Sequence, residues 1–196
     1  MIKLEYNAPV ILNITLFSFI ALIGNILTYG KLNELLFMSY KTSLLDPLLY
    51  IRLFTHILGH ESIEHFENNI IFFLLLGPLV EKKYGSKNLF FMILFTSFFI
   101  GVLNIIINTD YAILGLSGIV YMLMVMSAIL CFEERKIPLT FIVVMAIFIY
   151  QLLTTPGIFT DEITQLGHFI GGVSGLYFGF NFMKYNKNSK GENSYG

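Results

Sequence analysis

One serine of this 196-residue chain lies between two glycines, in the segment Gly115-Leu116-Ser117-Gly118. Glycines let another backbone approach closely, and a serine at the start of a helix has a backbone N–H without an intrahelical partner. A hydroxyl nucleophile beside an N–H that can bind an oxyanion is what acyl transfer requires. The same pattern suits a helix N-cap or a close helix contact, so it needs a base beside it to indicate hydrolysis.

A histidine further along the chain is the candidate base. His168 is followed by Gly171, Gly175 and Gly179, and these four positions fall on one narrow face of a helix. Glycines at this spacing let two membrane helices pack closely, so His168 can accept a proton from a hydroxyl on the neighbouring helix. An interhelical hydrogen bond is the alternative function of this histidine. The two motifs together favour a Ser117–His168 pair more than either does alone.

Two further side chains could stabilise a developing negative charge. His65 and Asn69 are four residues apart and therefore share one helix face. Both can donate hydrogen bonds, which is the requirement for an oxyanion hole. Hydrogen bonding between helices is the alternative for this pair as well.

A metal site is not expected. The zinc-protease motif His-Glu-x-x-His places two ligands four residues apart on one helix face. Here His60 and His65 are five residues apart, roughly 140° around a helix, so they do not converge. His56 and His60 are four apart but lie at or before the start of the predicted helix. We therefore expect no metal and no cofactor.

The composition indicates the environment in which these residues act. Apolar residues make up 56% of the chain, charged residues only 13%, and the mean hydropathy is +0.73. These values exclude a disordered chain and a simple soluble globule. The net charge of −1 gives no nucleic-acid footprint, and the single Cys131 excludes an internal disulfide. An integral membrane protein remains.

The hydropathy pattern predicts an all-α, polytopic membrane protein with six transmembrane helices in one domain, residues 1–184. A helix needs roughly 20 mostly apolar residues to cross the hydrocarbon core. The predicted spans are residues 9–29, 61–80, 88–108, 113–132, 138–154 and 165–184. Short apolar runs in the long first loop are expected to lie at the interface. Residues 185–196 form a predicted polar cytoplasmic tail.

The basic residues predict the orientation of these spans. If the N-terminus lies inside, nine of the 12 lysines and arginines lie in inside segments. The positive-inside rule therefore places both termini in the cytoplasm. Ser117, His65 and the long first loop then lie toward the outer face.

In order and spacing, these motifs resemble the rhomboid intramembrane serine proteases in their six-span form. The matching pieces extend from Arg52 to Gly179, nearly the whole chain. They are residues 52–56, His60 with His65 and Asn69, residues 77–86, residues 115–121 and residues 167–171.

The resemblance implies a multi-pass protein of a bacterial or archaeal cell membrane that cuts transmembrane protein substrates within the lipid bilayer. Ser117 is the implied nucleophile and His168 the general base. His65 and Asn69, with the Ser117 N–H, are the implied oxyanion hole. Implied supporting and structural residues are Gly115, Gly118, Tyr121 packed against His168, Gly171, Glu81 on the second span, and Arg52 near the end of the first loop.

Some features depart from the family pattern or suit another function. Many relatives carry Trp-Arg where this chain has Ile51-Arg52. This difference affects the expected membrane anchoring of the loop and not the expected chemistry. The carboxylates Glu61, Glu64 and Glu67 are hypothesised to line a water-filled vestibule, pair with Arg52 or favour basic substrates.

The alternative functions are a non-proteolytic rhomboid-like protein that binds helices and, with less support, a small transporter with a buried His and Glu path.

Overall fold

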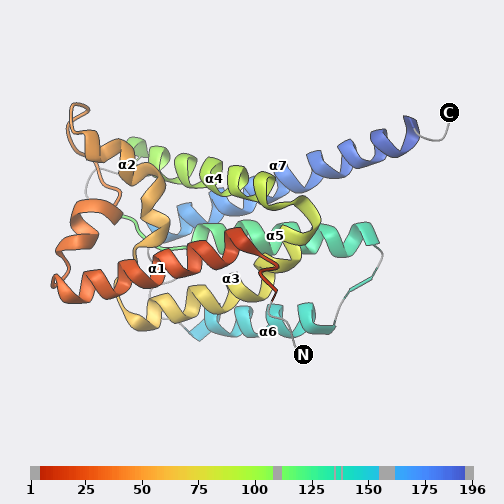
Figure 1. Ribbon diagram of the computed structural model, residues 1–196, viewed down its shortest axis with the longest axis horizontal. Helices are drawn as coiled ribbons and strands as arrows, with labels where there is room; N and C mark the ends of the chain where they lie inside the picture. The colour runs from red at the N-terminus through yellow and green to blue at the C-terminus, as the bar shows by residue number, and fades with distance from the viewer. Residues whose placement is uncertain (1–4, 108–111, 135, 138, 155–161, 193–196) are drawn as a thin grey trace.

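The computed structural model describes residues 5–107, 112–134, 136–137, 139–154 and 162–192, and its regular elements there are helices (Figure 1). Six of these helices are long, and three short ones interrupt the first loop. They are α1 (Pro9–Leu27), the π-helix η1 (Asn33–Phe37), α2 (Pro47–Thr55), the 3-10 helix η2 (His56–Leu58), α3 (Ile63–Tyr84), α4 (Ser86–Ile107), α5 (Ser117–Glu134), α6 (Leu139–Thr154) and α7 (Glu162–Glu192).

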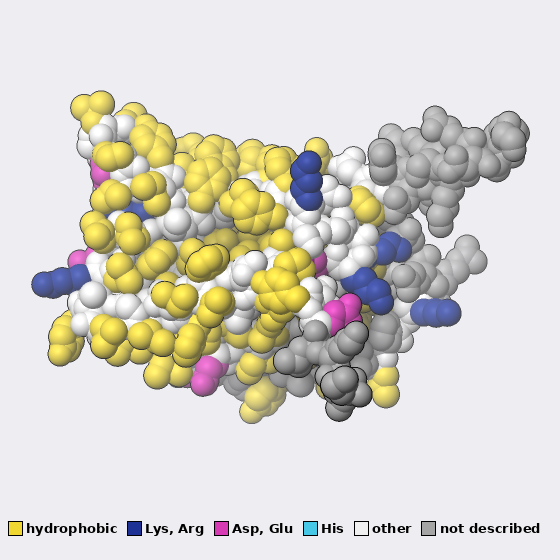
Figure 2. Space-filling model, in the orientation of Figure 1, with side chains coloured by type: hydrophobic (Ala, Val, Ile, Leu, Met, Phe, Trp, Pro, Cys, Tyr) yellow, Lys and Arg dark blue, Asp and Glu magenta, His cyan; other side chains and the backbone are white. Residues whose placement is uncertain are grey.

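Three of the described helices, α1, α3 and α4, have the length and hydropathy of membrane spans. Large apolar side chains point outward from them, including Phe17 at 55% exposure and Phe91 at 61%. Hydrophobic side chains accordingly cover much of the face shown in Figure 2. Such a surface suits lipid rather than water. The number of six crossings stays a prediction, and α7 continues as a helix into the segment predicted as a polar tail.

Helix α5 is the central element of the bundle and packs against α3, α4 and α7 (Figure 1). Its side chains supply much of the core, and Ile119, Met122, Leu123 and Met126 have no exposed surface. A helix that is apolar on all sides is buried either in a protein core or in lipid, and α5 is buried in the core of the bundle.

Helices α5 and α7 touch backbone to backbone. A Cβ atom added to Gly171 would overlap the carbonyl oxygen of Gly118, and one added to Gly175 would lie 2.6 Å from that of Met122. A Cβ atom on Gly179 would overlap the side chain of Ile129. The glycine face predicted from the sequence is therefore the contact surface of α7 with α5.

A carboxylate from α3 caps the start of α1. Ala8, the N-cap residue, provides no side-chain cap, and Pro9 has no N–H to satisfy. The buried Glu81 accepts hydrogen bonds from the backbone N–H groups of Val10 at 3.0 Å and Ile11 at 3.1 Å. Its negative charge also stabilises the positive end of the helix dipole. Glu81 thus fixes α1 to the second long helix.

The first loop folds around a buried arginine. The Nε–H of Arg52 donates to the carbonyl of Leu35 at 3.0 Å, and its Nη1 lies 3.5 Å from Oδ2 of Asp46. The guanidinium also lies over the ring of Tyr40, 4.6 Å from its centroid. These contacts compensate a charge that is 4% exposed.

The hypothesis that Arg52 pairs with Glu61, Glu64 or Glu67 is wrong, because Asp46 is its ionic partner. Asp46 is the N-cap of α2, the helix that carries Arg52, so the two charges lie within reach. The three glutamates instead lie exposed near the start of α3. Their contribution to substrate preference stays a prediction.

Glu81→Gln is expected to lower the melting temperature measured by circular dichroism in detergent. A glutamine has one acceptor oxygen, so one of the two buried N–H groups of α1 loses its partner, which costs about 1–3 kcal/mol. Glu67→Gln, the same change on the exposed side of α3, is the control and is expected to leave the melting temperature nearly unchanged. Equal melting temperatures for the two variants would contradict the capping function.

Candidate active site

Ser117 is the first residue of α5, and an extended segment holds it in place. Ile113 exchanges two backbone hydrogen bonds with Ser39 of the first loop, each 3.0 Å long. The N–H of Gly115 donates to the carbonyl of His56 at 2.9 Å. The sequence predicted a span from residue 113, but these bonds with the loop keep residues 113–115 outside the helix, which begins at Ser117. Ser117 therefore lies at the junction of the first loop and α5.

Gly115 fits this position for two reasons. Its φ of +115° lies in a region that other residues rarely adopt. A Cβ atom there would also lie 2.9 Å from Nε2 of His65. The imidazole of His65 therefore lies directly against the backbone two residues before Ser117.

His168 lies against the first turns of α5. Its ring stacks on that of Tyr121, with 4.1 Å between centroids and 13° between planes. One residue earlier on α7, the carbonyl oxygen of Gly167 would be 3.1 Å from a Cβ atom on Gly118. These two contacts fix the start of α5 against the part of α7 that carries His168.

Ser117 and His168 lie at the same height along the α5–α7 interface. Ser117 and Tyr121 are four residues apart on α5, so they share a face. Helical side chains lean toward the N-terminus, so the Tyr121 ring and the imidazole stacked on it lie on the Ser117 side of Tyr121. Ser117 is half-buried and His168 is 9% exposed. The structure thus brings a hydroxyl and an imidazole to one end of the α5–α7 interface.

Asn69 is buried on α3, one turn after His65. Its Nδ2 donates to the carbonyl of His65 at 2.8 Å, which occupies one of its two amide hydrogens. The second amide hydrogen is available for another acceptor. His65 and Asn69 therefore present donors from α3, the helix that packs beside α5.

Two histidines that sequence reasoning weighed as metal ligands and placed among the motifs of the resemblance, without a function of their own, support this site. Nε2 of His56 donates to the carbonyl of Ser97 on α4 at 3.0 Å, while its own carbonyl holds Gly115. His60 is fully buried, with its ring edge against that of His65 at 5.1 Å between centroids. His56 thus fixes the segment before Ser117, and His60 packs behind His65. No spacing pattern in the sequence signals such contacts.

Burial keeps both supporting histidines neutral. It lowers the pKa of His56 from 6.5 to about 4, although the hydrogen bond to Ser97 opposes the change. Burial, followed by the nearby His65, lowers the pKa of His60 to about 3. Both lie outside the long helices and are uncharged at neutral pH.

The described residues contain no group of three or more His, Cys, Asp or Glu side chains arranged to hold a metal ion. Glu61 and Glu64, near the start of α3, are exposed. The chemistry that the arrangement can perform on its own is nucleophilic attack by a hydroxyl with an imidazole as base.

Comparison with known protein families identifies the domain. The model of the rhomboid domain matches residues 48–185, which include Ser117, His168, His65 and Asn69. This match confirms the resemblance drawn from the motifs. Among curated proteins, no match to the chain is found.

Acid is expected to destabilise the protein between about pH 6.5 and pH 4. The unfolded chain protonates His56 and His60 near pH 6.5, whereas the folded protein binds these protons only near pH 4 and pH 3. The unfolded state thus binds more protons, and each histidine removes up to about 1.4 kcal/mol of stability per pH unit as the pH falls.

Thermal melts in detergent from pH 7.5 to pH 4.5 measure this loss. His56→Gln keeps a donor for the Ser97 carbonyl but removes one titrating group, so its loss of melting temperature on acidification should be smaller. An unchanged loss in this variant would show that His56 does not titrate as described.

Proposed function

Since the chain belongs to the rhomboid family, we propose that it is an intramembrane serine endopeptidase. It hydrolyses a peptide bond in or near the transmembrane helix of other membrane proteins. The observation that carries this proposal is the stacking of His168 on Tyr121, one helical turn after Ser117 on the same face. A hydroxyl and a base at one helix interface are the minimum that acyl transfer needs.

In the proposed mechanism, Ser117 attacks the carbonyl carbon of the scissile bond and His168 accepts the hydroxyl proton. The negative charge on the tetrahedral intermediate is stabilised by the Ser117 backbone N–H, His65 and Asn69. His168 then protonates the leaving amine, which releases one product. Water, deprotonated by His168, hydrolyses the acyl-enzyme and regenerates Ser117.

The supporting residues act through positioning. Tyr121 holds the plane of the His168 imidazole by stacking, with the rings 4.1 Å apart. Gly115 leaves space for the ring of His65, which a larger residue would displace. Gly118 and Gly171 let α5 and α7 approach closely enough for a proton to pass between their side chains.

Water and substrate reach the proposed nucleophile from the end of the bundle. Ser117 is the first residue of α5 and adjoins the segment paired with the first loop, so it does not lie midway along a helix. A substrate helix hides its carbonyls in backbone hydrogen bonds and must unwind locally before attack. Helix-breaking or small residues near the scissile bond should therefore favour cleavage.

The proposed setting is the cell membrane of a bacterium or archaeon, with six crossings and both termini in the cytoplasm. The excess of lysine and arginine in the segments expected inside supports this orientation. The catalytic end then faces the outside, where water is available for hydrolysis.

Covalent labelling by a fluorophosphonate is the test. The wild-type protein in detergent is expected to react at Ser117, and both Ser117→Ala and His168→Ala should abolish labelling, because one removes the nucleophile and the other its base. Ser127→Ala, a buried serine on the same helix, is the matched control and should label like the wild type. A folded wild-type protein that does not react would contradict the protease and favour a helix-binding function.

A further inference from the structure

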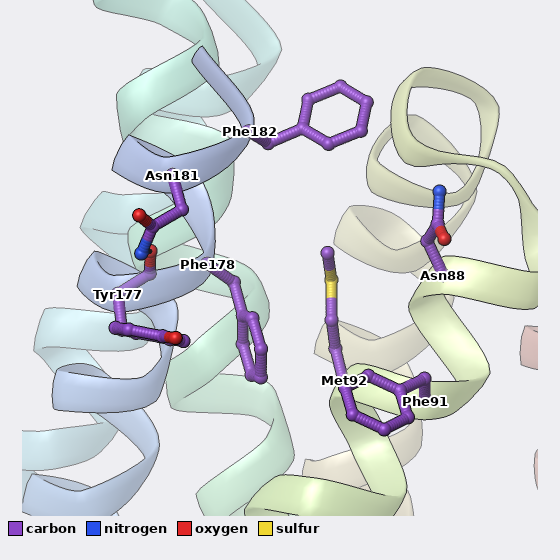
Figure 3. A pocket seen from close by; sticks show the side chains of 7 residues that line it. All are labelled: Asn88, Phe91, Met92, Tyr177, Phe178, Asn181 and Phe182. Atoms are coloured by element: carbon purple, nitrogen blue, oxygen red, sulfur yellow. Dashed lines mark hydrogen bonds between the residues drawn. The ribbon is translucent and has the colours of Figure 1, made fainter. Parts of the chain in front are cut away.

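A hollow lies between α4 and α7, away from Ser117. It has a volume of about 440 Å³, and its walls carry aromatic side chains together with two amides, Asn88 on α4 and Asn181 on α7. Figure 3 shows these two asparagines at similar levels on opposite walls, with Met92 and Phe178 between the helices below them. The proposed proteolytic mechanism uses none of these residues.

A second, mostly apolar cavity lies further along the same two helices. This neighbouring cavity of about 340 Å³ is lined by side chains of α4 and α7 that are mostly apolar, with Ser174 among them, and Tyr177 borders both cavities. On α4 the lining positions 88, 92, 95 and 99 recur every three or four residues, so they form one face. Because the two cavities share Tyr177 and one face of α4, we call them together the α4–α7 groove. From Asn88 to Leu103 it is about 22 Å long.

One end of the α4–α7 groove is polar. Nδ2 of Asn88 donates to the carbonyl of Tyr84, and Nδ2 of Asn181 donates to that of Tyr177, each at 2.8 Å. Each amide retains a second hydrogen and its oxygen for a ligand. The remainder of the groove is bordered by phenylalanine and aliphatic side chains such as Phe95 and Val173.

Positive charge gathers at this polar end. Lys87 is exposed and lies four residues before Phe91, a lining residue, so both project from the same face of α4. Because helical side chains lean toward the N-terminus, Lys87 extends past the end of the groove, beside Asn88. Lys82 and Lys83 lie in the last turn of the preceding helix. Figure 2 shows basic side chains near the end of the molecule where α3 and α4 meet.

We propose that the α4–α7 groove binds an anionic phospholipid from the leaflet on the side of the α3–α4 turn. Lys87 and the amides of Asn88 and Asn181 hold the headgroup phosphate, and one acyl chain lies along Phe95, Phe99 and Leu103. Basic pockets between membrane helices attract anionic headgroups in this way.

The order of polar and apolar surface favours a lipid over other occupants. Donors and positive charge at one end, followed by an apolar channel of about 22 Å, match a headgroup and its chain. The groove opens beside Phe91, Phe169 and Tyr177, which are 58–69% exposed on the outer surface of the bundle. Lipid is the molecule that contacts such a surface in a membrane. The proposal is independent of proteolysis.

The absence of tryptophan from the sequence makes a direct test possible. Phe91→Trp places a single fluorophore on the wall of the groove, and Phe17→Trp places one on the exposed side of α1 as a control. Each variant is reconstituted in nanodiscs of phosphatidylcholine and phosphatidylglycerol, with bromines on the acyl chains of one lipid at a time. The quenching ratio reports which lipid contacts each tryptophan. Phe182→Trp, on the opposite wall, replaces Phe91→Trp if the latter does not fold.

The groove tryptophan is expected to prefer phosphatidylglycerol over phosphatidylcholine by about fivefold, the effect of one lysine near an anionic headgroup. The control tryptophan should show a ratio near one. Lys87→Gln in the groove variant should reduce its ratio to that of the control. Equal ratios at the two tryptophans, or a preference that Lys87→Gln leaves unchanged, would overturn the proposal.

Discussion

The backbone contact between Gly118 of α5 and Gly171 of α7 is the constraint on which the candidate site depends. Because a Cβ atom at Gly171 would overlap the carbonyl oxygen of Gly118, these helices lie closer than other residues would allow. Ser117 directly precedes one of these glycines, and His168 lies one turn before the other. In the proposed mechanism, the packing of these two backbones determines how the Ser117 hydroxyl approaches the His168 imidazole.

The first loop supplies the second constraint, since a close helix contact alone does not fix the start of α5. The carbonyl of His56 and the backbone of Ser39 hold the segment that leads to Ser117. Asn33 connects this loop to α1, because its backbone N–H donates to Oδ1 of Asn25 and its side-chain amide donates to the carbonyl of His60. Substitutions in the first loop, far from Ser117 in sequence, can therefore change the position of the start of α5.

The periodicity and composition of the sequence were sufficient to predict the glycine contact of α7 and a helical membrane protein. Glycines spaced every three or four residues predicted that the His168 side of α7 packs against another helix, and the structure identifies that helix as α5. Composition predicted a helical membrane protein, and the family match agrees with the order of the motifs.

Contacts between side chains and backbone were beyond sequence reasoning because they follow no spacing rule. The apolar residues Ile113 and Leu114 read as the beginning of a helix, yet hydrogen bonds with a distant loop keep this segment extended. The pairing of Arg52 with Asp46 depends on where α2 begins, because Asp46 caps the helix that carries Arg52. The supporting positions of His56 and His60 likewise depend on carbonyls and rings that only the folded chain brings together.

Two adjacent glycines on α7 allow the central claim to be tested directly. Gly171 touches Gly118, whereas a Cβ atom on Gly172 would have no neighbour within 4 Å. The measurement is the rate at which a fluorophosphonate labels Ser117 in Gly171→Ala and Gly172→Ala. We predict that Gly172→Ala reacts like the wild type, while Gly171→Ala reacts at least about tenfold more slowly because small displacements of a base have large effects on rate. Wild-type labelling in Gly171→Ala would contradict the account.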